Sequence, residues 1–455
     1  MKGKSGNHGS SGTLVERFAG FAESYRAGAI EPQVLHHAKR AVIDWHAALL
    51  PGSVVPPATL LERALAGEIG KGGGGNESRL ADGRRAGVRA AALINGAAAH
   101  AVEVDDIYRE GIYHPGAPTI AAALAIAQSR GASGEALLRA VIVGYEISTR
   151  IARAMGRAHY RYWHNTGTIG CFGAAGAAAE VLGLERARFA HTLATVTTFA
   201  AGLQQAFRSD SMSKPMHAGR AADAGVTAAL AAAEGVTGAL DILEGEAGFG
   251  KAMGDGPDWE AALTGLGEDF SICKMTFKNH ACCGHAFAAI DGALALKAKM
   301  GIAAEQIARV RVGGYRATLE VAGIADPATA AEARFSTPYL VATALTHGSV
   351  RLAAFEPARL EDPATRALMR RVELSLDPAL DADFPARRAA RVAIEARDGR
   401  SGEHLQPTRK GDPDAPLSDA ELESKYLELA SPVLGRERAR TLLARLWNLE
   451  RESRL

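Results

Sequence analysis

The stretch RAAALINGAAAHAV at residues 89–102 decides the fold, because four other segments of the chain share its alanine-rich, apolar character. Alanine has the highest helix propensity, and its small side chain lets neighbouring helices pack closely. A helix that is apolar on every side is a buried one. The chain is therefore predicted to form a compact domain of inner helices surrounded by outer ones. The other four segments are residues 119–128, 134–155, 173–184 and 224–236.

Amphipathic helices and a hairpin are expected around these buried segments. Residues 14–25 and 32–50 carry apolar side chains at helical spacing. Because Asp-Gly is a preferred two-residue turn, Asp82-Gly83 predicts a short hairpin over residues 78–86. Two other segments are expected to be irregular: a flexible loop at residues 71–76 and a disordered Gly/Ser-rich tail at residues 1–12.

The character of the sequence changes near residue 268. Three segments beyond it are rich in β-branched residues with partial alternation, which predicts strands. The last of them contains Asp398-Gly399, a hairpin turn, and PYLVATALTHGSV is a helical segment that precedes the second strand segment. Residues 268–405 are therefore predicted to form a smaller α+β domain. The strand segments are residues 308–323, 370–377 and 387–405.

The end of the chain returns to a helical pattern, with Ser418 as a good N-cap before DAELESKYLELA. This segment is expected to pack back on the first domain, which makes the α+β domain an insertion. The predicted fold class is mainly α: a large all-helical domain at residues 13–267 plus 406–455, with an inserted smaller α+β lid domain.

Composition excludes several classes of protein. A net charge of +1 argues against a broadly basic nucleic-acid-binding surface. No segment approaches the roughly 20 apolar residues that a membrane span needs, and no signal segment opens the chain. The cysteines form no CxxC pair and are predicted to be reduced thiols. We expect a cytoplasmic protein that binds neither nucleic acid nor membrane. The cysteines are Cys171, Cys273, Cys282 and Cys283.

Two stretches place histidines among apolar residues, where a polar group is costly unless it is paired. In the first, an alanine-rich helix is expected to run past His100 into Glu103, Asp105 and Asp106, before a loop that ends at His114. His100 and Glu103 would share a helical face, and a carboxylate near an imidazole orients it and raises its basicity. The alternative is a helix end with a solvated acidic cluster.

In the second stretch, residues 159–175, His164 precedes a Gly/Thr loop that opens a helix. Helix N-termini favour anions. The alternative is a satisfied structural histidine.

A third stretch carries Lys214, His217 and Arg220 at a spacing of three residues, at the start of a helix. Three cations on one face repel one another unless an anion lies between them, which indicates a carboxylate-binding site. The alternative is a solvated basic turn.

The fourth stretch, residues 274–289, contains Lys278, His280 and His285 around Cys282-Cys283. Adjacent cysteines rarely both reach one tetrahedral zinc, so a metal site is not favoured and the thiols are predicted to be packing residues. The chain also has no GxGxxG motif after a strand, no P-loop and no GxSxG elbow, which argues against dinucleotide chemistry and phosphoryl transfer.

Taken together, these stretches resemble the MmgE/PrpD family. Six motifs occur in the family's order and span residues 13–450, among them NGAAAHAVEVDD, HNTGTIGCFGAAGAAAEVLGL, SKPMHAGRAADAG and KNHACCGHAFAAID. The resemblance implies a helical domain with an α+β lid, a pocket between the two, a homodimer and no cofactor or metal.

The resemblance also implies the roles of individual residues. Those carried over as catalytic are His114, His164, Lys214, Tyr339 and Glu103, and those carried over as substrate-binding are Lys278, His217, Arg220, Asp105, Asp106 and His280. Two departures from the family's decarboxylases stand out, because Glu103 replaces an Asp and Cys283 replaces a His of the animal pattern. Both weigh against cis-aconitate decarboxylation.

The activity that the resemblance implies is a cofactor-independent hydro-lyase, similar to 2-methylcitrate dehydratase. It would remove a proton next to a carboxylate of a small di- or tricarboxylate and eliminate water. The alternatives are an epimerase or decarboxylase acting on a related polycarboxylate, with iminodisuccinate or cis-aconitate as examples. A further alternative is a non-catalytic polycarboxylate-binding protein.

Overall fold

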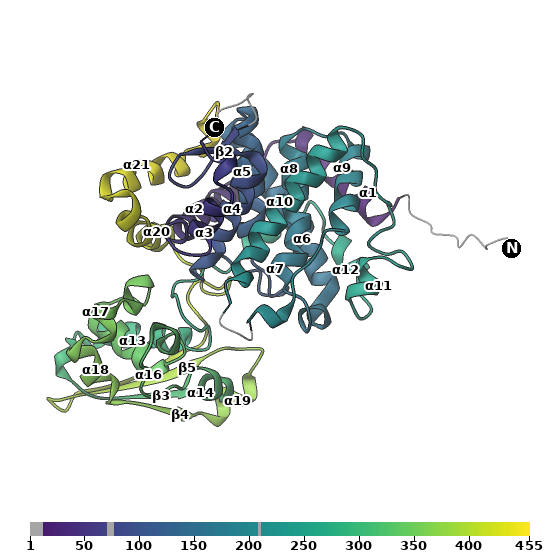
Figure 1. The fold of residues 1–455 in the computed structure, drawn as a ribbon. Helices are drawn as coiled ribbons and strands as arrows, with labels where there is room; N and C mark the ends of the chain where they lie inside the picture. Colours follow the sequence, from purple (N-terminus) through teal and green to yellow (C-terminus); the bar gives the residue numbers. More distant parts are fainter. Residues whose placement is uncertain (1–11, 71–76, 208–210) are drawn as a thin grey trace. The chain divides into compact units, whose positions relative to one another are not determined.

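The computed structural model describes residues 12–70, 77–207 and 211–455, and within these it is mainly helical with a small α+β part (Figure 1). The predicted fold class is confirmed. The chain divides into two compact units, a helical unit of residues 1–101, 105–275 and 426–455 and a smaller unit of residues 102–104 and 276–425. The flexible loop expected at residues 71–76 and nearly all of the expected N-terminal tail lie outside the described residues.

The helical unit is built from long buried helices and short peripheral ones. The hairpin expected at Asp82-Gly83 is confirmed, because β1 (Glu77–Arg79) and β2 (Arg85–Gly87) pair antiparallel around it. The helices are α1 (Leu14–Ala27), α2 (Pro32–Ser53), α3 (Ala58–Ala64), α4 (Val88–Ala101), α5 (Gly116–Arg130), α6 (Gly134–Tyr160), α7 (Asn165–Thr168), α8 (Gly170–Val181), α9 (Arg186–Thr197), α10 (Ser213–Ala233), α11 (Phe249–Met253), α12 (Trp259–Leu263) and α21 (Arg436–Trp447).

Glycines and alanines set how closely the inner helices approach. Where α4 crosses α10, a Cβ added to Gly219 would lie 2.2 Å from the carbonyl oxygen of Leu93. Where α8 crosses α10, a Cβ on Gly225 would lie 2.5 Å from the Cβ of Ala174. Figure 1 shows α4 and α10 side by side in the interior of this unit. The alanine-rich segments therefore form the core, as the sequence predicts.

The smaller unit is a four-stranded sheet with helices against it. The strand order is β4-β3-β5-β6, with β3 parallel to β4 and antiparallel to β5. Helices α13 and α16 pack on the sheet and on each other (Figure 1). The strands are β3 (Ile307–Gly314), β4 (Val372–Leu376), β5 (Ala390–Ala396) and β6 (Ser401–Gln406), and the helices are α13 (Phe287–Met300), α14 (Arg316–Ala322), α15 (Ala330–Ala333), α16 (Thr337–His347), α17 (Pro357–Leu360), α18 (Pro363–Met369) and α19 (Pro378–Asp383).

Several local predictions can be compared with these elements. The strand expected over residues 308–323 ends at Gly314 and continues as α14. Helix α20 (Asp419–Leu434) begins after Ser418, whose Oγ accepts a hydrogen bond from Glu421 N, so the predicted cap is confirmed.

The observed unit boundaries differ from the predicted domain boundaries at both ends of the insertion. Residues 268–275 group with the helical unit, and residues 406–425 group with the smaller one. Among the described helices, none combines the length and the apolar character needed to cross a membrane.

The crossing of α4 and α10 generates a stability prediction. Gly219→Ala forces a methyl group against the Leu93 carbonyl, and overpacking of this kind costs about 1–3 kcal/mol. The midpoint of thermal unfolding, followed by circular dichroism, should fall by several degrees. Gly67→Ala is the matched control, because a Cβ at that position meets no atom within 4 Å. Equal midpoints for the two variants would contradict the close approach described here.

Candidate active site

Asp105 is a buried carboxylate that contacts two imidazoles. Its Oδ2 lies 2.7 Å from Nδ1 of His100, in the last turn of α4, and 3.2 Å from Nδ1 of His114. His100 is fully buried and Asp105 is 1% exposed. Burial by itself would raise the pKa of Asp105, but the two imidazoles and their hydrogen bonds hold it well below its usual range. The ionised carboxylate favours a proton on each Nδ1, which leaves each Nε2 as the basic position.

His164 and His217 form a second imidazole pair in the same unit. Their Nδ1 atoms lie 3.0 Å apart, so one ring donates and the other accepts. The His164 ring stacks on the His100 ring at a centroid distance of 5.5 Å, which joins the two pairs into one cluster. Burial and the surrounding cationic groups lower the pKa of His164 well below its usual range, and the pKa of His217 is lowered by burial and by charges at His100 and Lys214. Both rings are therefore neutral near pH 7.

The predicted basic helix start lies beside this cluster. Lys214 is in the first turn of α10 and is partly buried. Arg220 is exposed, and its guanidinium lies 3.9 Å from the carboxylate of Asp223. A cavity of about 510 Å³ reaches both His217 and Arg220. It is lined by Ala201, Gly202, Leu203, Gln205, Ala206, Ser211, Ser213, His217 and Arg220.

Asp106 faces a different set of partners from Asp105. Its Oδ2 accepts a hydrogen bond from the Tyr145 hydroxyl at 2.7 Å, and its Oδ1 accepts one from Gly116 N at 3.0 Å. Burial and the nearby Asp44 carboxylate raise the pKa of Asp106 to about 8. Asp106 thus fixes the first residue of α5, two positions after His114.

The ligand atoms of His100, Asp105 and His114 all lie within 4.8 Å of one another, which is the composition of a three-ligand metal site. At metal–ligand bonds of about 2.0–2.1 Å, two ligands of a tetrahedral zinc are roughly 3.3 Å apart. The His100 Nδ1 and Asp105 Oδ2 atoms are 2.7 Å apart, which is the distance of a direct hydrogen bond. The geometry therefore fits an acid–base cluster better than a metal centre.

The predicted residues of the smaller unit have partners inside that unit. Lys278 Nζ donates to the carbonyl oxygen of Glu103 at 2.9 Å and lies 3.4 Å from its carboxylate. The Tyr339 hydroxyl donates to the carbonyl oxygen of Ala354 at 2.5 Å. His280 Nε2 lies 2.8 Å from a carboxylate oxygen of Asp291.

Two details of the site differ from the sequence prediction. Helix α4 ends at Ala101, and Glu103 has a φ of 61°, so His100 and Glu103 do not share a helical face. The carboxylate that meets His100 belongs instead to Asp105. A signal for this pairing was present, because a histidine inside an alanine-rich helix needs a buried partner.

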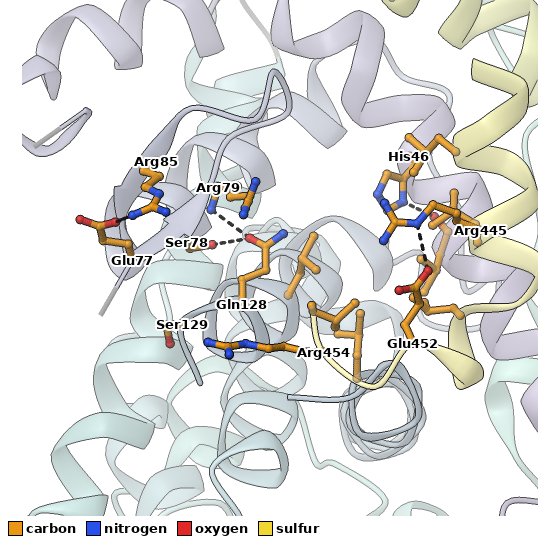
Figure 2. A pocket seen from close by; sticks show the side chains of 17 residues that line it. His46, Glu77, Ser78, Arg79, Arg85, Gln128, Ser129, Arg445, Glu452 and Arg454 are labelled. Atoms are coloured by element: carbon orange, nitrogen blue, oxygen red, sulfur yellow. Dashed lines mark hydrogen bonds and ion pairs between the residues drawn. The ribbon is translucent and has the colours of Figure 1, made fainter. Parts of the chain in front are cut away.

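A second cavity, of about 680 Å³, shares no residue with the histidine cluster. Figure 2 shows that Gln128 accepts hydrogen bonds from Ser78 and from the backbone of Arg79 on one side of this cavity. The Arg445–Glu452 ion pair lies on the other side (Figure 2). Leucines from α5, α6 and α21 also line this cavity.

Comparisons with known proteins cover both units. Residues 16–262 match the MmgE/PrpD N-terminal domain, and residues 280–449 match the MmgE/PrpD C-terminal domain. The cis-aconitate decarboxylase-like protein oryM of Aspergillus oryzae is 28% identical, over 96% of this chain and 95% of its own length. Human cis-aconitate decarboxylase is 26% identical, over 96% and 92%. Cis-aconitate decarboxylase of Aspergillus terreus is 26% identical, over 93% and 90%.

The raised pKa of Asp106 predicts a pH-dependent effect of Asp106→Asn. Between pH about 4 and the folded-state pKa of about 8, the folded protein keeps a proton that the unfolded chain has released, so wild-type stability falls as pH rises. Asparagine cannot ionise, so the stability of the variant does not fall with pH for this reason. The unfolding midpoint of Asp106→Asn, relative to wild type, should therefore be higher at pH 8 than at pH 5.

The control is Asp398→Asn, in the exposed β5–β6 turn, where ion pairing and hydrogen bonding with Arg400 lower the carboxylate pKa. That carboxylate is ionised in both states above pH 5, so its midpoint difference should not change with pH. An equally constant difference for Asp106→Asn would show that Asp106 is ionised in the folded protein.

Proposed function

Because the chain belongs to the MmgE/PrpD family, we propose that it is a lyase that moves a proton at the carbon next to a carboxylate of a small di- or tricarboxylate. The observation that supports this most directly is the buried, ionised Asp105 between two imidazoles, beside a neutral imidazole pair. Proton transfer needs groups that hold and release protons near neutral pH, and imidazole is the side chain suited to that.

The two imidazole pairs are suited to different roles. The lowered pKa of His164 keeps its ring neutral near pH 7, which is the form that can accept a proton from carbon. His114, held by the ionised Asp105 through Nδ1, can donate or accept at Nε2. When the environments of two titratable groups move their pKa values apart, one group commonly acts as the acid and the other as the base.

Lys214 supplies positive charge for the substrate. The proton next to a carboxylate is weakly acidic, and the enolate-like anion formed by its removal needs a cation held in place beforehand. Lys214 is close enough to lower the pKa of both His164 and His217. A substrate carboxylate beside Lys214 would therefore present its neighbouring carbon to these rings.

Dehydration is the reaction that we propose first. The base takes the proton from carbon, the electron pair forms the carbon–carbon double bond, and the β-hydroxyl leaves as water after protonation by the acid. This is the 2-methylcitrate dehydratase-like reaction that the family resemblance implies. Glu103 and Cys283, which depart from the decarboxylase pattern, support elimination over decarboxylation.

Decarboxylation of cis-aconitate is the second candidate. It is favoured by the relatives, because curated proteins that match more than 90% of this chain are named cis-aconitate decarboxylases or decarboxylase-like. In that reaction the electrons of the bond to the departing carboxylate shift onto carbon, which then receives a proton. The same imidazoles would act as proton donors.

One incubation distinguishes these reactions. The protein is placed in D2O with 2-methylcitrate, citrate, cis-aconitate or iminodisuccinate and followed by proton NMR. A new alkene signal from a hydroxy acid identifies a hydro-lyase, and loss of a carboxylate from cis-aconitate identifies a decarboxylase. Deuterium incorporation without elimination identifies an epimerase. A ligand that raises the unfolding midpoint without any reaction would overturn the enzymatic assignment in favour of a binding protein.

Substitutions at the cluster test the assigned residues. His164→Ala should lower kcat by about 10²–10⁴-fold, the usual contribution of a general acid or base. Lys214→Ala should also abolish most turnover, with an unchanged circular dichroism spectrum. His404→Ala and Lys251→Ala are matched controls at residues that have no assigned role in the cluster, and they should retain wild-type kcat. Near-normal activity of both cluster variants would exclude this site.

A further inference from the structure

Three residues between α4 and Asp105 belong to the smaller unit. Val102–Val104 group with residues 276–425, whereas Ala101 before them and Asp105 after them group with the helical unit. The segment between the two partners of the His100–Asp105 hydrogen bond thus includes three residues that group with the smaller unit. The Val104–Asp105 peptide bond therefore links Asp105 directly to any group that binds this tripeptide.

Two lysines hold the tripeptide by its backbone. Lys278 Nζ donates to the Glu103 carbonyl at 2.9 Å, and Lys425 Nζ donates to the Val104 carbonyl at 2.7 Å. Glu103 has a φ of 61°, a left-handed conformation that a residue with a side chain keeps only where the surroundings enforce it. The two ammonium groups provide that enforcement at successive carbonyls.

Lys425 is the more unusual of the two. It is fully buried, on the part of α20 that belongs to the smaller unit. A buried ammonium is costly unless strong acceptors compensate it. The Val104 carbonyl is one such acceptor, and the 2.7 Å hydrogen bond constrains the direction in which that carbonyl points.

The planarity of the peptide bond carries this constraint forward. The Val104 carbonyl and the N and Cα atoms of Asp105 lie in one plane. A hydrogen bond to the carbonyl oxygen therefore restricts where the Asp105 N and Cα can lie, and with them the position from which its side chain starts. The carboxylate of that side chain must reach Nδ1 of His100 at 2.7 Å and Nδ1 of His114 at 3.2 Å.

We propose that Lys425 is a positioning residue for the histidine cluster, acting through the Val104 carbonyl on the carboxylate of Asp105. Lys425 itself takes no part in proton transfer. The kinetic consequence rests on the proposed lyase function, but the effect on the imidazoles does not.

The test compares Lys425→Met with Lys297→Met. Both lysines belong to the smaller unit and donate to a backbone carbonyl, but Lys297 holds Leu345, far from Asp105 in the sequence. In Lys425→Met, kcat should fall about 10²-fold, the loss expected from misplacing a catalytic group by about 1 Å, while KM changes little. Lys425→Arg, which keeps a cationic donor, should recover part of kcat.

A spectroscopic measurement makes the test independent of the substrate. The ring nitrogen signals of His100 and His114, assigned by single substitutions in 15N-histidine-labelled protein, should move in Lys425→Met and stay in place in Lys297→Met. If no polycarboxylate reacts but these signals move, the proposed function fails and the positioning role stands. If Lys425→Met turns over substrate like Lys297→Met and its ring signals are unmoved, the positioning role fails.

Loss of folding is also decisive. Lys425→Gln keeps a shorter, neutral donor and is measured in parallel. If Lys425→Met unfolds but Lys425→Gln folds, the glutamine variant should show the same fall in kcat and the same moved signals. If both unfold while Lys297→Met folds, Lys425 is a structural residue and the proposal is overturned.

Discussion

The charge of Asp105 is the constraint on which the rest of the site depends. A carboxylate that is 1% exposed inside an alanine-rich helical unit needs partners within the protein, since water cannot reach it. His100 supplies one from the last turn of α4, and His114 supplies another from the far end of the following loop. The contacts of Asp105 with both histidines therefore tie the two ends of the segment between α4 and α5 together, and they orient both imidazole rings.

The close packing of the helices explains where the polar groups can stand. Glycines at the crossings of α10 with α4 and α8 bring the backbones into contact and leave no room for polar side chains between them. The histidines lie instead at helix ends: His100 in the last turn of α4, His164 at the N-cap of α7 and His217 near the start of α10. The packed helix crossings thus make the unit rigid, and the helix ends carry the imidazoles proposed to transfer protons.

Much of the fold could be predicted because it depends on local chemistry. Alanine-rich segments favour helices that pack closely, Asp82-Gly83 closes its hairpin, and Ser418 caps the helix that follows it. The site was harder to predict, because its geometry depends on residues remote in the sequence. Lys278 and Lys425 are 175 and 321 positions from the carbonyls they hold. No periodicity near Glu103 signals that the helix stops before it.

The charge balance of the cluster follows from these environments and bears on what it can bind. Asp105 and Asp106 are adjacent, and two ionised carboxylates there would repel a substrate that is itself a polyanion. Asp106 avoids this, because burial and Asp44 raise its pKa to about 8 and keep it largely protonated at neutral pH. The charge of Asp105 is stabilised by its hydrogen bonds with the two imidazoles, and Lys214 adds a positive charge beside the cluster. The environment thus removes one negative charge and compensates the other, which makes a site rich in carboxylates compatible with an anionic substrate.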